Sequence, residues 1–152
     1  MKLWTLMTCA LLAFGGARIA QAAGALCKLQ ITGNDLMHYD KKELKVPSDC
    51  SQIELTLTHT GKLPAQTMGH TWVLAKTTDV SAIINAGIGA GAANNYVAPG
   101  DKRVIASTKI VGGGQSTSIT FPASALKPGG DYTFFCNFPG HAALMTGKFI
   151  VG

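Results

Sequence analysis

The chain has 152 residues, of which 14% are charged and 47% are hydrophobic, and its formal net charge is +5. Its lysines are interspersed with acidic residues, so it lacks the basic stripe of a nucleic-acid-binding protein, and we expect no nucleic-acid partner. After the N-terminal segment, no stretch approaches the roughly 18 apolar residues of a membrane-spanning helix, and we expect no membrane insertion.

Residues 1–22 have the pattern of a cleaved secretory signal peptide. Lys2 precedes an apolar run from Leu3 to Phe14, and a small-residue site ends at Ala22. We expect cleavage near Ala22, which leaves one domain of residues 23–152. Because Lys2 and Arg18 are removed, the net charge of the mature chain falls from +5 to about +3.

Alternating hydrophobicity with a period of two predicts about eight short strands in the mature chain. Turn signals such as Gly33-Asn34-Asp35 and Pro128-Gly129-Gly130 separate them. This pattern predicts an all-β domain, built as an antiparallel sandwich or barrel. In chain order, the predicted strands lie at residues 29–31, 44–46, 53–59, 72–74, 104–106, 119–121, 132–136 and 148–151.

The segment from Asp79 to Ala93 follows a different pattern. Ile83, Ile84 and Ile88 have the spacing of one helical face, and Asp79 is a candidate N-cap. We predict one short helix in a long connection, on one side of the sandwich.

The cysteines indicate one disulfide and one free thiol. Cys9 leaves with the signal peptide, and an odd number of cysteines remains in an oxidising compartment. Cys27 and Cys50 both lie at strand edges near the mature N-terminus, which favours their pairing. A bridge between them would close a loop of about 24 residues and would stabilise the fold by about 3 kcal/mol. Cys136 is then the free thiol, and burial or a metal ion would protect it from oxidation.

The segment from Cys136 to Met145 combines a thiol, the imidazole of His141 and a thioether within ten residues. A trigonal copper site uses one thiolate, two imidazoles and a long, weak axial thioether. His70 lies just before another predicted strand and can supply the second imidazole. We therefore predict a copper site at one end of the sandwich, formed by His70, Cys136, His141 and axial Met145.

The same residue types also occur in proteins that bind no copper. Singly, each is commonly a buried or turn residue, but their joint occurrence in an exported chain favours copper. Zinc prefers four strong ligands in close pairs, and only three strong ligands occur here. A nucleophilic Cys136–His141 pair would need an orienting third residue and a substrate cleft, and neither is evident, so we do not expect an enzyme.

Across residues 23–152 the chain resembles the azurins, blue-copper proteins of the cupredoxin family. The Cys136-x4-His141-x3-Met145 spacing is specific, because plastocyanin-like relatives have a shorter loop between cysteine and histidine. The resemblance implies an eight-stranded Greek-key cupredoxin sandwich or barrel. The shared motifs are Cys27 and Cys50, Gly33-Asn34-Asp35, Met68-Gly69-His70, Trp72-Val73-Leu74, Arg103-Val104-Ile105-Ala106 and the segment from Phe134 to Met145.

The resemblance also implies roles for individual residues. It makes His70, Cys136 and His141 the equatorial ligands of one type 1 copper ion and Met145 the axial ligand. It makes the Gly69 carbonyl oxygen a second weak axial contact and Cys27–Cys50 the family disulfide. His59 matches a buried histidine near the site that is not a ligand, and His38 matches no residue with a family role.

Two positions depart from the family pattern. Thr71 stands where asparagine is common, and Asn137 stands where threonine is common. In the family these positions interlock the two ligand loops, and the backbone amides of residues 71 and 138 donate toward the thiolate. We predict that the exchange preserves the side-chain hydrogen bond in the reverse direction, with Thr71, Asn137 and Phe138 surrounding the ligands.

Functionally, the resemblance implies a periplasmic electron-transfer protein, monomeric, that passes single electrons through Cu(II)/Cu(I). Its partners would be c-type cytochromes or periplasmic reductases and dehydrogenases, met transiently. A copper storage, delivery or protective protein without a dedicated redox partner is the alternative. The expected docking patch around His141 consists of Met37, Leu63, Met68, Phe138, Pro139, Gly140 and Leu144.

Overall fold

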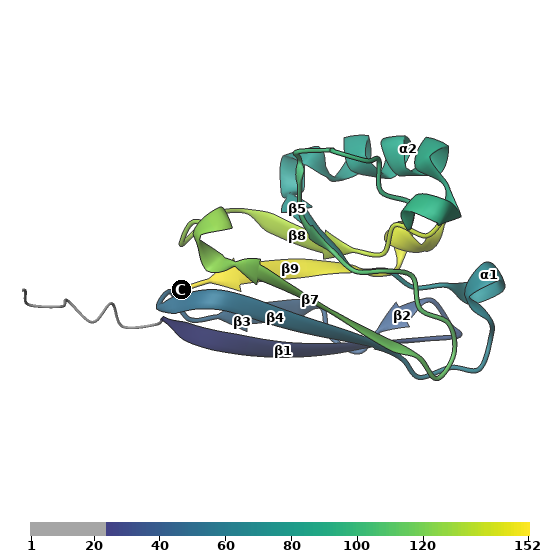
Figure 1. Ribbon diagram of the computed structural model, residues 1–152, viewed down its shortest axis with the longest axis horizontal. Coiled ribbons are helices and arrows are strands. Elements are labelled where there is room, and N and C mark those ends of the chain that lie inside the picture. The colour runs from purple at the N-terminus through teal and green to yellow at the C-terminus, as the bar shows by residue number, and fades with distance from the viewer. Residues whose placement is uncertain (1–23) are drawn as a thin grey trace, which may run out of the picture.

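The structure is a computed structural model that describes residues 24–152. The predicted signal peptide lies outside the described residues. Two β-sheets pack face to face, and helix α2 (Val80–Ala90) lies on the outer side of one of them (Figure 1). In residues 24–152, no helix has the length and hydropathy needed to cross a membrane.

The described part of the chain contains nine strands in two separate sheets, so the fold is an open sandwich and not a closed barrel. One sheet has the order β2 (His38–Tyr39), β1 (Ala25–Asn34), β4 (Cys50–His59) and β7 (Ser116–Pro122). The other has the order β3 (Glu43–Val46), β9 (Thr146–Val151), β8 (Tyr132–Phe135), β5 (Val73–Lys76) and β6 (Val104–Ser107).

The predicted all-β class is confirmed, and a strand occurs at each of the eight predicted positions. The ninth strand, β2, has only two residues, which is too short for alternation to reveal. The predicted antiparallel arrangement holds for five strand pairs but was wrong for two, because β1 pairs with β4 and β3 pairs with β9 in parallel. The chain places β3 in the opposite sheet before β4 returns beside β1, so that β1 and β4 run in the same direction.

The predicted helix in the long connection is α2, between β5 and β6. Asp79 stands at its N-cap position but makes no capping hydrogen bond. Its backbone is helical (φ −97°, ψ −12°) because the 3-10 turn Thr77–Asp79 precedes α2, whereas a capping side chain needs an extended residue. Gly91, at φ 69°, ends the helix. A helix that was not predicted, α1 (Ala65–Met68), precedes the His70 loop.

The core fills the space between the sheets with the inward faces of the strands. Ile53, Leu55 and Leu57 of β4 are fully buried, and His59 continues the same face at the end of the strand. Trp72 packs among Phe121, Phe134 and Phe149, with ring centroids 6.1–6.2 Å apart. Such burial excludes water from the interior and supplies most of the stabilisation of the domain.

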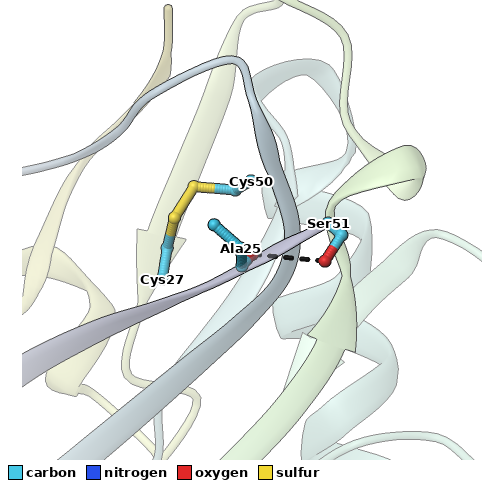
Figure 2. Close-up of a disulfide and its surroundings, with 4 residues drawn as sticks. All are labelled: Ala25, Cys27, Cys50 and Ser51. Atoms are coloured by element: carbon cyan, nitrogen blue, oxygen red, sulfur yellow. Dashed lines mark hydrogen bonds between the residues drawn. A yellow bond between two sulfur atoms is a disulfide. The ribbon is translucent and has the colours of Figure 1, made fainter. Parts of the chain in front are cut away.

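The predicted Cys27–Cys50 disulfide is confirmed and joins β1 to β4 (Figure 2). The two Cα atoms are 5.8 Å apart, within the usual range for a disulfide. Beside it, the Ser51 hydroxyl donates a 3.2 Å hydrogen bond to the Ala25 carbonyl oxygen. Cys136 is the one free cysteine of the described residues, and it is buried.

Candidate metal centre

The predicted side-chain ligands reach one end of the sandwich on two loops. Cys136 directly follows β8, His141 begins the 3-10 turn His141–Ala143, and Met145 directly precedes β9. Because β8 and β9 are antiparallel neighbours, the loop between them folds back over the end of the sheet. His70 lies on the other loop, held by two 2.9 Å backbone hydrogen bonds with Val111.

His70, Cys136 and His141 form the single potential metal-binding cluster found within residues 24–152. One ligand atom from each residue lies within 4.8 Å of the other two, and all three residues are buried. Cys136 Sγ lies 3.7 Å from His141 Nδ1. An ion among these atoms would be held by one sulfur and two nitrogens and shielded from bulk water.

His70 presents a free lone pair to the centre. Its Nε2 lies 2.9 Å from the Asn34 carbonyl oxygen, which only accepts, so we assign the ring proton to Nε2. In the neutral ring Nδ1 is then an acceptor, and it lies 3.1 Å from a second acceptor, the Gly69 carbonyl oxygen. Two acceptors at this distance with no proton between them fit a site for a cation.

Burial favours the neutral form of both imidazoles, which is the form that binds metal. For His70, burial lowers the pKa, and the hydrogen bond to Asn34 partly opposes this. For His141, burial and then repulsion from His70 and His59 lower the pKa to about 4. The fully buried His59 stacks on His70, with ring centroids 4.2 Å apart and planes 10° from parallel.

Cys136 lies in an environment where its thiolate form is unfavourable unless a cation is bound nearby. Burial raises the pKa of its thiol, because a charged sulfur is poorly solvated in the core. The Thr71 backbone N–H opposes this by donating to Sγ at 3.4 Å, and the Phe138 backbone N–H also lowers the pKa of the thiol. A bound metal ion would displace the proton and stabilise the thiolate.

Met145 is completely buried beside the His70 ring. The Met145 methyl group and the His70 ring both lie against Gly33, where a Cβ atom would be 3.1 Å from Met145 Cε and 2.6 Å from His70 Cδ2. The backbone of Met145 receives a 2.9 Å hydrogen bond from Cys136 N–H and donates a 2.8 Å bond to the His141 carbonyl oxygen. This loop is therefore tied together by its own backbone.

Thr71 and Asn137 interlock the two loops, but not by the predicted reversed side-chain bond, which was wrong. The Asn137 backbone N–H donates to the Thr71 hydroxyl oxygen at 2.9 Å. The Asn137 side chain turns away and donates to the Tyr96 carbonyl oxygen. It can do so because Gly87 leaves room, since a Cβ there would be 2.4 Å from Asn137 Nδ2.

The predicted docking residues differ in exposure. Leu144 is 52% exposed and Leu63 39%, and Pro139 and Gly140 are also exposed. Met37, Met68 and Phe138 are partly buried, and the His141 ring is almost covered. His38 is exposed.

Sequence reasoning missed several contributors to the centre. The Asn34 backbone oxygen orients His70, and the buried Tyr39 hydroxyl donates to the Thr71 carbonyl oxygen. Neither interaction leaves a local signal, because each joins residues more than 30 positions apart.

Helical spacing places Ile88 on a packed face, yet it is 63% exposed and lines an apolar groove of about 270 Å³ with Phe138 and Pro139.

A buried thiol with two neutral imidazoles, at one end of a two-sheet sandwich, defines a metal-binding domain with soft and borderline ligands. The same residues match a known family, copper binding proteins of the plastocyanin/azurin family, over residues 25–152. The chain belongs to this family, whose cofactor is copper, and His70, Cys136 and His141 form its potential metal site.

Within the family, the chain is similar to azurins. It is 52% identical to the azurin of Bordetella pertussis over 128 residues, which cover 84% of this chain and 85% of that protein. It is 51% identical to azurin-1 of Alcaligenes xylosoxydans xylosoxydans over 123 residues, which cover 81% of this chain and 95% of that protein. A solved structure of the azurin Az-iso2 from Methylomonas sp. strain J superposes with a TM-score of 0.80 at 44% identity. The match covers 83% of this chain and 98% of that one.

Proposed function

We propose that this protein is a periplasmic carrier of single electrons whose redox centre is one type 1 copper ion. His70, Cys136 and His141 would hold the ion, and Met145 and the Gly69 carbonyl oxygen would make weaker contacts with it. The observation that carries the proposal is the convergence of one buried sulfur and two imidazoles within 4.8 Å. When bound, copper supplies the Cu(II)/Cu(I) couple.

Rigidity of the ligands supports electron transfer. Backbone hydrogen bonds fix His70 to Val111 and Cys136 to Met145, and Thr71 joins the two loops. Ligands that are fixed before metal binds change little in position when the charge of the ion changes. All three residues of the cluster are buried, so a substrate would have poor access to the ion, which favours a carrier over an enzyme.

We propose that electrons pass at the His141 end of the molecule. The apolar residues expected there include the exposed Leu63 and Leu144. An apolar patch of this kind suits brief contact with redox proteins such as c-type cytochromes, reductases or dehydrogenases, whose weak interfaces are small. The protein would act as a monomer, and the predicted signal peptide supports export to the periplasm.

Copper loading and electron exchange test the proposal together. The mature protein should turn intensely blue with Cu(II), and Cys136→Ser should remain colourless. The Cu(I) form of the protein, which is colourless, should then reduce an oxidised c-type cytochrome, keep its copper and turn blue as it is oxidised. A colourless protein would contradict the copper centre, whereas loss of copper to a chelator or acceptor without electron exchange would support storage or delivery.

A charge-matched pair of variants tests the patch. Met68→Lys should slow electron exchange with the cytochrome and leave the visible spectrum unchanged. Thr120→Lys adds the same charge on an exposed position of β7 and should leave the rate unchanged. Equal rates for Met68→Lys and the unmodified protein, at matched ionic strength, would remove the patch from the proposal.

A further inference from the structure

The Thr71 hydroxyl group lies between the two ligand loops, sealed from solvent. Thr71 is fully buried, and its oxygen accepts the 2.9 Å hydrogen bond from the Asn137 backbone N–H. That bond uses a lone pair of the oxygen and leaves the hydroxyl proton to be directed elsewhere.

The Cys136 sulfur is the acceptor that this proton reaches among residues 24–152. Thr71 Oγ1 lies 3.9 Å from Cys136 Sγ, and the Thr71 backbone nitrogen lies 3.4 Å from the same sulfur. A buried hydroxyl proton with no acceptor is costly, so its orientation toward the sulfur is strongly favoured.

The position of Thr71 is fixed from both sides. The Tyr39 hydroxyl donates to the Thr71 carbonyl oxygen, and the next backbone N–H, that of Trp72, donates to Thr108 Oγ1 at 2.9 Å. These bonds fix the backbone of Thr71, and rotation of its side chain away from the sulfur would break the hydrogen bond that Thr71 Oγ1 accepts from the Asn137 backbone N–H.

We propose that the Thr71 hydroxyl is a further hydrogen-bond donor to the Cys136 sulfur, and that this positioning residue raises the reduction potential of the centre. The inference rests on the proposed copper site. An additional donor stabilises negative charge on the sulfur, and the sulfur is more negative in the reduced protein than in the oxidised protein. The hydroxyl thus favours the reduced form, beyond what the backbone N–H groups contribute.

The test compares three variants by their reduction potentials. Thr71→Val keeps the shape and removes the hydroxyl, and Thr71→Ser keeps the hydroxyl. Thr71→Val should shift the electron-exchange equilibrium with a redox mediator about tenfold toward the oxidised form, which is ~59 mV for one electron. Thr71→Ser should retain the potential of the unmodified protein. The matched control Thr146→Val, which removes a hydroxyl bonded to the Phe134 carbonyl oxygen, should leave it unchanged.

A second measurement needs no variant. In the protein loaded with ¹¹³Cd(II), NMR should show scalar coupling from cadmium, through the sulfur, to the Thr71 hydroxyl proton as well as to the Thr71 backbone N–H. Coupling to the N–H alone would overturn the inference, as would an unchanged potential in a blue Thr71→Val protein. Failure of the unmodified protein to turn blue would instead contradict the proposed function.

Discussion

Substitution of Gly33 by alanine tests whether the centre is preformed by close packing. Gly33 ends the part of β1 that pairs with β4 and lies opposite His59, and its missing side chain leaves room for the His70 ring. A methyl group there would lie 2.6 Å from His70 Cδ2 and 3.2 Å from His70 Nε2. The first distance is roughly 1 Å inside the optimal carbon–carbon separation of about 3.5–4.0 Å.

The His70 ring has little freedom to give way. The His59 ring stacks on the His70 ring, with centroids 4.2 Å apart. His70 Nε2 is also hydrogen-bonded to the Asn34 carbonyl oxygen at 2.9 Å. Overpacking of this kind costs about 1–3 kcal/mol, and here part of the cost falls on a proposed copper ligand. We expect Gly33→Ala to lower the free energy of unfolding of the copper-free protein by this amount and to weaken copper binding at least tenfold.

Urea denaturation of the copper-free protein and competitive copper titration measure the two effects. Gly89→Ala is the matched control, because a Cβ atom at this helical position meets nothing within 4 Å. The control should be unchanged or more stable by about 0.5–1 kcal/mol, since alanine favours helix over glycine. A Gly33→Ala protein with unaltered stability and copper affinity would refute the close packing of Gly33 against His70.

Three further predictions concern stability. Folding holds the pKa of His141 at about 4 in the copper-free protein, below its ordinary 6.5, so its contribution is complete above pH 6.5 and is lost as the pH falls toward 4. Urea titrations of the copper-free protein should show the free energy of unfolding falling over this range, and a flat profile would contradict it. Replacing both Cys27 and Cys50 by alanine should lower the free energy of unfolding by about 3 kcal/mol, given their separation of 23 residues, and should leave the blue colour. Equal stability of the variant and the unmodified protein would contradict a stabilising role of the disulfide. Tyr39→Phe should cost about 1–3 kcal/mol, because it leaves the buried Thr71 carbonyl oxygen without its donor, and a neutral substitution would show that another group replaces it.

Local patterns were sufficient to predict most of the fold. Ile53, Leu55, Leu57 and His59 share one face of β4, as their alternation indicates, because one side of the strand faces the core. The loop after Cys136 also follows from its own residues, since Pro139 and Gly140 turn the chain between adjacent strands. Periodicity and turn chemistry are short-range properties, so a single sequence carries them.

Other features depended on contacts between distant residues and could not be predicted. The parallel pairing of β1 with β4 is decided by which sheet β3 enters, and no residue in either strand encodes this alone. The direction of the Asn137 side chain depends on the space that Gly87 leaves and on the Tyr96 carbonyl oxygen. The exchange of Thr71 and Asn137 therefore suggested a reciprocal bond, whereas a third segment of the chain provides the acceptor.

The parallel pair of β1 and β4 links the two ends of the molecule mechanically. The disulfide at Cys27 closes one end, and the pairing of Gly33 with His59 lies about 20 Å further along the strands, at about 3.3 Å per residue. Slippage of β1 by one position would turn alternate side chains outward and separate Gly33 from the stacked imidazoles. The covalent bridge restrains such slippage, so a bond remote from the ligands helps to keep the metal end in alignment.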